Sequence, residues 1–322
     1  NVFFTLLGDA TSYKEEHYPL DQEIIEEGLK CCETLNKKYK GEIFHFVYRK
    51  RKYSKGEETY LGWEGKRGAL QDLNQLILGQ LTKEEQEDYF QANTIKEDLK
   101  IKYVMPLDAD TKLGLGSISR LIGTMAHPMN QPVLNKERTK VIRGYGMMQP
   151  KVTFDLSLEN QSTYSQTFAG LGGYDVYSSV VPDFYQDVFQ ESNFYGKGIY
   201  DLAVFNEVIL NNHFPKNRIL SHDLLEGSYT RCGYVSDVDF YDDFPSDFLV
   251  DSKRQHRWAR GDMQILAWAF KKNPLNAIHR FKFIDNIRRG LLPFFLLLII
   301  IFAYTISPTA PHYWILFVIL IL

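Results

Sequence analysis

The stretch from Ile101 to Thr111 constrains the fold of this chain more than any other part of the sequence. An apolar run that ends at Leu107 is followed at once by Asp108 and Asp110. Such a run predicts a buried strand, which would deliver both carboxylates to the C-terminal edge of a sheet. In an open α/β sheet that edge is where ligands bind. Two adjacent carboxylates favour a bound cation, and oxygen ligands suit Mg²⁺ or Mn²⁺. The alternative is a capped strand end with both acids in solvent.

The segments around this strand alternate between apolar runs and helical periodicity. We expect strands over Phe3–Leu7 and Ile43–Tyr48. Helices are expected over Leu20–Tyr39, Gly68–Leu78 and Ser117–Met125. This alternation predicts an α/β sheet. Two stretches are expected outside it, a basic turn over Arg49–Lys55 and an exposed polar excursion over Leu81–Lys100.

Charge and hydropathy bear on the partners of the chain. The 322 residues carry a formal net charge of −3, which argues against a nucleic-acid partner. Leu291–Ile306 is almost wholly apolar, and a second apolar segment begins at Tyr313 after a short turn. This pattern favours a membrane hairpin in a lipid bilayer over a single buried helix. The basic residues that precede it predict, by the positive-inside rule, a cytoplasmic location for the rest of the chain.

The sequence also supplies the groups that one class of reaction requires. Displacement of a metal-bound diphosphate needs carboxylates for the metal, cations for the phosphates and a base for the attacking hydroxyl. Asp108 and Asp110 offer the metal site, and Asp223 offers the base, with Glu226 as an alternative. Asp223 could also be a first-turn acid of a helix with Ser221 as its N-cap. The candidate cations, which could equally be surface charges, are Lys66, Arg67, Arg257 and Arg260.

Several long motifs carry a resemblance to a known family over nearly the whole chain. They are Leu6–Asp9, Gly62–Leu70, Leu107–Thr111, Gly123–Pro128, Tyr145–Pro150, Tyr185–Asp187, Gly196–Asp201, Ile219–Gly227 and Arg254–Asp262. With these motifs the sequence resembles the glycosyltransferase domain of the cyclic β-1,2-glucan synthases, glycosyltransferase family 84. It is more distantly similar to the family 2 processive transferases such as cellulose synthase. Arg254 stands where the wider group has the first Gln of its Gln-x-x-Arg-Trp motif, and Ser12 stands where a second acid is common.

The resemblance implies a GT-A type nucleotide-sugar-binding fold, UDP-glucose as donor and a growing β-glucan, most simply β-1,2-linked, as acceptor and product. Asp223 would be the catalytic base of an inverting reaction, and Asp108 and Asp110 would hold the Mg²⁺ or Mn²⁺. The implied donor-binding residues are Asp9, Lys66, Arg67, Asp108 and Arg257. The implied acceptor-binding residues are Trp258, Gln255, Gly196 and Lys197.

These expectations define a domain organisation and a location. We predict a GT-A domain over residues 1–270, without the first strand usual in the family, and a membrane-proximal segment with a truncated transmembrane hairpin over residues 271–322. Further domains of the same polypeptide are expected, as is the inner membrane of a bacterium with the catalytic domain in the cytoplasm.

Two alternative functions compete with this interpretation. Asp-Ala-Asp-Thr also fits the Asp-x-Asp-x-Thr signature of haloacid-dehalogenase-type, Mg²⁺-dependent phosphatases. That family needs a further acidic loop, and Gly261-Asp262 is followed by no second acid before Phe270. The other alternative is a membrane-tethered UDP-sugar sensor derived from an inactive transferase, with which the intact metal and base candidates disagree.

Overall fold

The computed structural model describes residues 2–96, 99–155, 162–169, 183–212, 214–215, 222–306 and 311–321. The chain divides by contacts into two compact units, Asn1–Asp247 and Phe248–Leu322, and each is described by itself. The expected boundary between residues 270 and 271 lies inside the second unit. It stays a prediction, because a division by contacts is not a division by function.

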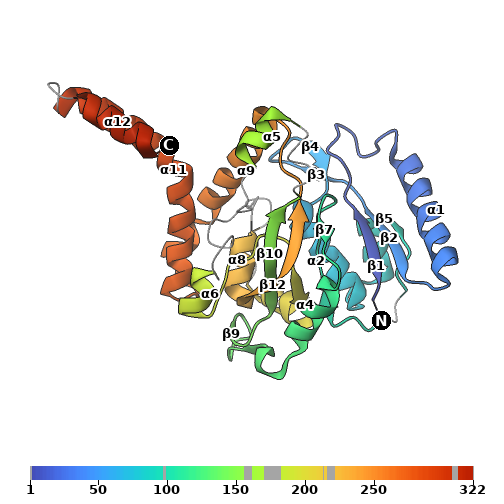
Figure 1. The fold of residues 1–322 in the computed structure, drawn as a ribbon. Helices are drawn as coiled ribbons and strands as arrows, with labels where there is room; N and C mark the ends of the chain where they lie inside the picture. Colours follow the sequence, from blue (N-terminus) through green and yellow to red (C-terminus); the bar gives the residue numbers. More distant parts are fainter. Residues whose placement is uncertain are drawn as a thin grey trace. The chain divides into compact units, whose positions relative to one another are not determined.

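The first unit is a mixture of strands and helices (Figure 1). Its elements in chain order are β1 Phe4–Gly8, α1 Asp21–Tyr39, β2 Phe44–Arg49, β3 Lys52–Ser54, β4 Thr59–Leu61, α2 Gly65–Ile77, α3 Lys83–Tyr89, β5 Phe90–Asn93, β6 Tyr103–Val104, β7 Lys112–Leu113, α4 Ser117–Ala126, the 3-10 helix η1 Pro128–Asn130, β8 Val133–Leu134, β9 Val141–Arg143, β10 Met147–Phe154, α5 Thr163–Phe168, α6 Phe184–Phe189, β11 Ile199–Asp201, α7 Leu202–Asn211, α8 Asp223–Thr230 and β12 Cys232–Asp242. The mixed α/β class and the two strands and three helices expected at the start of the chain are confirmed.

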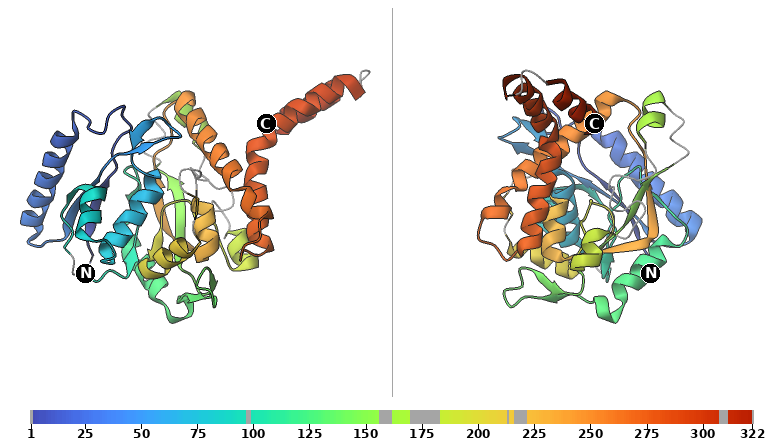
Figure 2. Two further views of the ribbon diagram at one scale, coloured as in Figure 1. Left: turned by 180° about the vertical axis from the view of Figure 1, so that it is seen from behind. Right: turned by 60° about the vertical axis from the view of Figure 1, so that its left-hand side comes forward.

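One sheet has the strand order β1-β2-β5, with β1 and β2 parallel and β5 antiparallel to β2. Successive side chains of a strand point to opposite faces, and β2 buries both. Val47 packs with Leu73 and other residues of α2 on one face, and Phe46 packs with Cys32 of α1 on the other. The two helices therefore cover opposite faces of this sheet (Figures 1 and 2). At the β1 edge, which no described strand covers, Phe4 is 46% and Leu6 is 58% exposed.

Two expectations for this region are wrong. The polar stretch Leu81–Lys100 contains a helix, α3, and a sheet strand, β5, because Phe90 is buried against the sheet. The expected basic turn over Arg49–Lys55 instead contains a strand, β3, which forms a hairpin with β4. Arg49 and Arg51 in it are both 2% exposed, since each pairs with a carboxylate of the interior.

A second, mixed sheet has the strand order β6-β11-β10-β12-β7. Its centre is the parallel pair β10 and β12, whose register is irregular between Pro150 and Lys151. Leu121 and other residues of α4 pack on Met148 and Phe240 of these two strands to form a core cluster. The expected strand over Ile101–Leu107 is shorter than predicted, since β6 covers only two residues and ends four positions before Asp108.

The second unit is helical in its described part. Its elements are α9 Phe248–Ile265, α10 Ala267–Phe270, α11 Ala277–Ile306 and α12 Pro311–Ile321. Both predicted apolar segments are thus helical, and the turn at residues 307–310 lies outside the described residues. Among the described residues, no single helix meets the length and hydropathy expected of a membrane span. The segments Ala277–Arg288 and Gly290–Thr305 meet them only as a pair, with a bend of 54° between them.

The core cluster under α4 yields a test of the fold. Leu121 is 0% exposed, so Leu121→Ala should leave a cavity and lower the free energy of unfolding by about 2–5 kcal/mol. Leu115, just before the same helix, is 105% exposed, and Leu115→Ala should change it by less than about 0.5 kcal/mol. Urea unfolding of both variants measures the difference, and equal effects would contradict this packing.

Candidate active site

Four residues that are far apart in the sequence meet in the first unit. The Lys66 ammonium lies 2.5 Å from Asp108 Oδ1 and donates to the carbonyl oxygen of Gly196 at 2.7 Å. A Cβ atom on Gly196 would lie 3.0 Å from Asp223 Oδ2. The start of α2, the segment after β6, the turn before β11 and the start of α8 therefore converge on one place. We call these four residues the central cluster.

Gly196 occupies a position that only glycine fits well. Its φ of +84° is in the left-handed region, where a side chain is strained. Its missing side chain is also what allows the Asp223 carboxylate to approach, since an added Cβ would press on all three carboxyl atoms. The sequence predicted Gly196 as acceptor-binding, and the structure places it between the candidate base and Lys66.

Asp108 is shared by two lysines. Lys66 contacts Oδ1, and the Lys197 ammonium lies 3.1 Å from Oδ2. Burial alone would raise the pKa of Asp108, but the two ammonium groups outweigh it and hold the pKa below its ordinary value. The carboxylate is therefore ionised at neutral pH. Asp110, the other predicted metal ligand, is exposed and has no ion-pair partner among the described residues.

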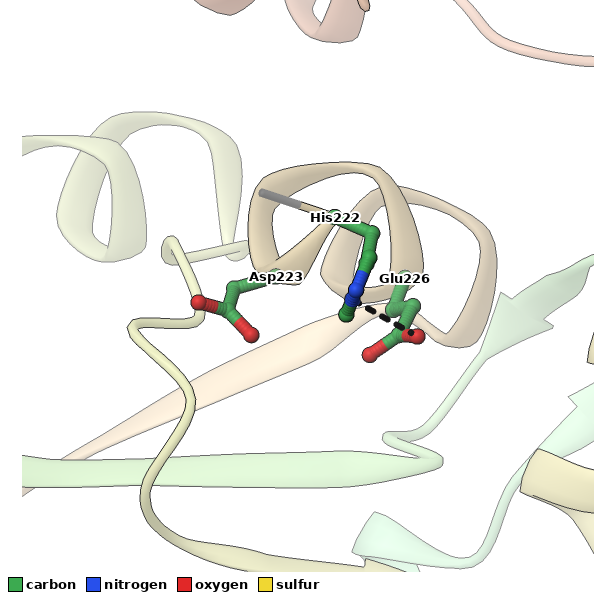
Figure 3. A group of neighbouring side chains, drawn as sticks. All are labelled: His222, Asp223 and Glu226. Atoms are coloured by element: carbon green, nitrogen blue, oxygen red, sulfur yellow. Dashed lines mark ion pairs between the residues drawn. The ribbon is translucent and has the colours of Figure 1, made fainter. Parts of the chain in front are cut away.

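Asp223 also belongs to a second cluster of ionisable side chains, which lies at the first turn of α8 and includes His222 and Glu226 (Figure 3). His222 Nδ1 lies 3.3 Å from Glu226 Oε1, and both residues are buried. Figure 3 shows the Asp223 carboxylate apart from this ion pair, on the other side of the turn. The predicted N-cap, Ser221, lies outside the described residues, and His222 stands at the N-cap position without a capping side-chain hydrogen bond.

The charges around Asp223 favour a basic carboxylate. Burial raises the pKa of Asp223; the His222 and Lys66 charges lower it, Glu226 and Asp108 raise it, and the net shift is upward. Burial alone would lower the pKa of His222, but the Glu226 carboxylate outweighs this and raises it. Since a carboxylate with a raised pKa binds a proton more readily, Asp223 has the electrostatic setting of a general base.

Two sets of residues offer ligands for a divalent cation. Asp108 and Asp110 supply the oxygen atoms that Mg²⁺ and Mn²⁺ prefer, and both are at least partly accessible. Because both oxygens of Asp108 contact lysines, a cation there would displace at least one ammonium group. One ligand atom from each of His222, Asp223 and Glu226 also lies within 4.8 Å of the others. In this second set, however, His222 already pairs with the Glu226 carboxylate. Asp108 and Asp110 therefore fit the predicted ion better.

Asp9, one of the predicted donor-binding residues, is held by a buried arginine that the sequence analysis missed. Arg49 Nη1 lies 2.9 Å from Asp9 Oδ1, and Nη2 lies 2.8 Å from Asp72 Oδ2. The same guanidinium donates to the carbonyl oxygens of Trp63 and Gly65. Burial raises the pKa of Asp9, and Arg49 only partly opposes this shift. Arg49 is the last residue of β2 and directly follows an apolar run, and that position was the available signal.

The remaining predicted residues lie elsewhere. The Arg67 guanidinium pairs with Glu64 at 2.6 Å and lines a cavity of about 510 Å³ beside α2, which includes no residue of the central cluster. Gln255, Arg257 and Trp258 all lie on α9 in the second unit. There the Arg254 guanidinium lies 4.9 Å from the centre of the Trp258 ring. Their positions relative to the central cluster stay a prediction.

The sequence was compared with protein-family models and with known proteins. No protein-family model matches it. Over 320 residues, 97% of the chain, it is 38% identical to the cyclic β-(1,2)-glucan synthase NdvB of Rhizobium meliloti (strain 1021). The chain spans 11% of the length of that relative. The resemblance expected from the motifs is confirmed, and the chain is a cyclic glucan synthase-related domain.

Proposed function

We propose that this chain is the catalytic part of a membrane-bound inverting glucosyltransferase that transfers glucose from UDP-glucose to a growing β-glucan, most simply β-1,2-glucan. The observation that carries the proposal is the central cluster. It brings an ionised carboxylate, a cation and a basic carboxylate together from four separate segments. The relationship to a glucan synthase supports the same chemistry. The rest of the longer polypeptide would supply the remaining domains.

The chain's own residues divide the work of such a transfer. Asp223 would accept the proton of the attacking acceptor hydroxyl, which its raised pKa favours. Lys66 would compensate negative charge on the departing diphosphate, since its ammonium lies at the Asp108 carboxylate. A Mg²⁺ or Mn²⁺ held by Asp108 and Asp110 would stabilise that same charge as a Lewis acid. With attack and departure on opposite faces of the sugar, one displacement inverts the donor's α configuration to β.

A GT-A type fold is the finer architecture we propose. The parallel pair β1 and β2 has helices on both faces, and Asp9 follows the C-terminal end of β1. Ligands of open α/β sheets bind at that end. A transmembrane hairpin built from α11 and α12, and a cytoplasmic catalytic domain at the inner membrane, belong to the same proposal. They rest on the apolar composition of these helices and the basic residues before them.

The phosphatase and sensor alternatives are less well supported. A phosphatase nucleophile must present a free carboxylate oxygen to phosphate, whereas both oxygens of Asp108 contact lysines. An inactive sensor would not need the base, whereas Asp223 keeps a raised pKa within the central cluster. Binding of UDP-glucose without turnover would identify the sensor.

Replacement of the base is the most direct test of the function. Asp223→Asn keeps the shape of the side chain but removes its basicity. In the full-length enzyme, glucosyl transfer should fall by about 10²-fold or more while UDP-glucose binding survives. Glu226→Gln is the comparison, because Glu226 lies one turn further along α8. Near-normal transfer by Asp223→Asn together with an inactive Glu226→Gln would assign the base to Glu226. Activity in both variants would refute the inverting mechanism proposed here.

The metal assignment can be tested at its more accessible ligand. Asp110→Asn should raise the Mg²⁺ or Mn²⁺ concentration for half-maximal transfer by at least about 10-fold. Even loss of a residue that only hydrogen-bonds to a metal ligand typically lowers metal affinity by about that factor. Asp108→Asn should have the same effect, and it also removes the negative charge with which Lys66 and Lys197 pair. Asp237→Asn, a change at another exposed aspartate, is the matched control. Metal titrations of the three variants would contradict the assignment if they superimposed.

The raised pKa of Asp223 predicts a pH dependence. A general base must be deprotonated, so kcat/KM should fall as the pH drops through the pKa of Asp223. Because burial raises that pKa, the fall should begin at a higher pH than for an exposed aspartate. His222, Glu226, Lys66 and Asp108 set this charge environment, so profiles are best compared at constant ionic strength. An acidic limb at the ordinary aspartate value would contradict this electrostatic assignment.

A further inference from the structure

Lys197, which the sequence analysis predicts to bind the acceptor, is a buried residue. It is 8% exposed, and its ammonium donates to Asp242 Oδ2 while lying 3.1 Å from Asp108 Oδ2. Asp242, the last residue of β12, is 0% exposed. Its second oxygen accepts a hydrogen bond of 2.9 Å from the Thr111 hydroxyl. Asp242 thus holds both Lys197 and the segment that carries the two predicted metal ligands.

Lys66, Asp108, Lys197 and Asp242 alternate in charge, and we call them the charge ladder. An ammonium group has three N–H donors. Lys66 uses two of them, on Asp108 and on the Gly196 carbonyl, and Lys197 uses two, on Asp108 and Asp242. In the described part of the chain each lysine therefore keeps one donor for a ligand. Two such donors beside one carboxylate suit an anion with several oxygens.

The burial of Asp242 fixes where the Lys197 charge sits. The Lys197 ammonium contacts the carboxylates of both Asp242 and Asp108, so two negative charges hold it in place. A lysine normally carries its charge on a flexible stem, and a buried carboxylate partner removes that freedom. If Asp108 held a divalent cation, Lys197 would have one partner fewer and would be able to bind a phosphate oxygen instead.

We propose that Lys197 binds the diphosphate of the nucleotide-sugar donor, and that buried Asp242 is the positioning residue that holds its ammonium group there. The inference rests on the proposed function and refines it. It moves Lys197 from the acceptor side to the donor side, because its ammonium contacts the candidate metal carboxylate Asp108. The candidate base, Asp223, meets the neighbouring residue Gly196 instead.

The test compares UDP with uridine, which differ only in the diphosphate. Dissociation constants of both are measured on the purified full-length polypeptide with Mg²⁺ present. Lys197→Met should weaken UDP binding by about 10- to 100-fold, the value of a charge-assisted contact, and change uridine binding by less than about 2-fold. Lys197→Arg should recover part of the UDP affinity. Asp242→Asn should weaken UDP binding in the same selective way but less, since Lys197 remains.

Lys140→Met is the matched control, because Lys140 is also buried, at 7% exposure, and lies outside the charge ladder. It should leave the preference for UDP over uridine intact. If either single variant fails to fold, the double variant Lys197→Met with Asp242→Asn removes both buried charges together and should still lose the preference. Unchanged UDP affinity with a raised KM for the glucan acceptor would overturn the inference and restore the acceptor role. A wild-type protein that binds no UDP would instead refute the proposed function.

Discussion

The contacts of the buried Arg49 guanidinium group hold together the part of this domain that we assign to donor binding. The guanidinium joins Asp9 after β1, Asp72 on α2 and the backbone carbonyls of Trp63 and Gly65. The two carbonyls belong to the segment that presents Lys66. One buried cation therefore fixes a strand end, a helix and a loop at once, and removal of a partner from such a buried pair typically costs about 3–5 kcal/mol.

The central cluster depends on a second constraint, the close approach of backbone and carboxylate at Gly196. Lys66 donates to the carbonyl oxygen of this residue, and the Asp223 carboxylate lies close to where a Cβ atom would stand. The cation and the base therefore both lie beside one glycine. This coupling explains why a glycine, which has no reactive side chain, stands among the residues that carry the chemistry.

Much of the fold could be predicted from local pattern, and much of the site could not. The end of the Ile101–Leu107 run pointed to Asp108, which the structure brings together with Lys66 and Lys197, although β6 is shorter than the run. The long helices α1, α2 and α4 follow their periodicity. Arg49 and Asp242 were missed because the partners that make them important are remote: Asp72 lies 23 residues from Arg49, and Lys197 lies 45 residues from Asp242. A charged residue after an apolar strand is ambiguous until its partner is known. The same ambiguity made the stretch over Leu81–Lys100 look exposed, since its single buried aromatic residue is outweighed by polar neighbours.

The edge of β1 has a consequence for handling these residues as a separate protein. Its backbone groups on that side meet no described strand, and Phe4 and Leu6 are exposed beside them. An uncovered strand edge with apolar side chains is a template for pairing with another chain. A preparation limited to this domain should therefore tend toward edge-to-edge association as its concentration rises. Charged substitutions at Phe4 or Leu6 would be the rational remedy.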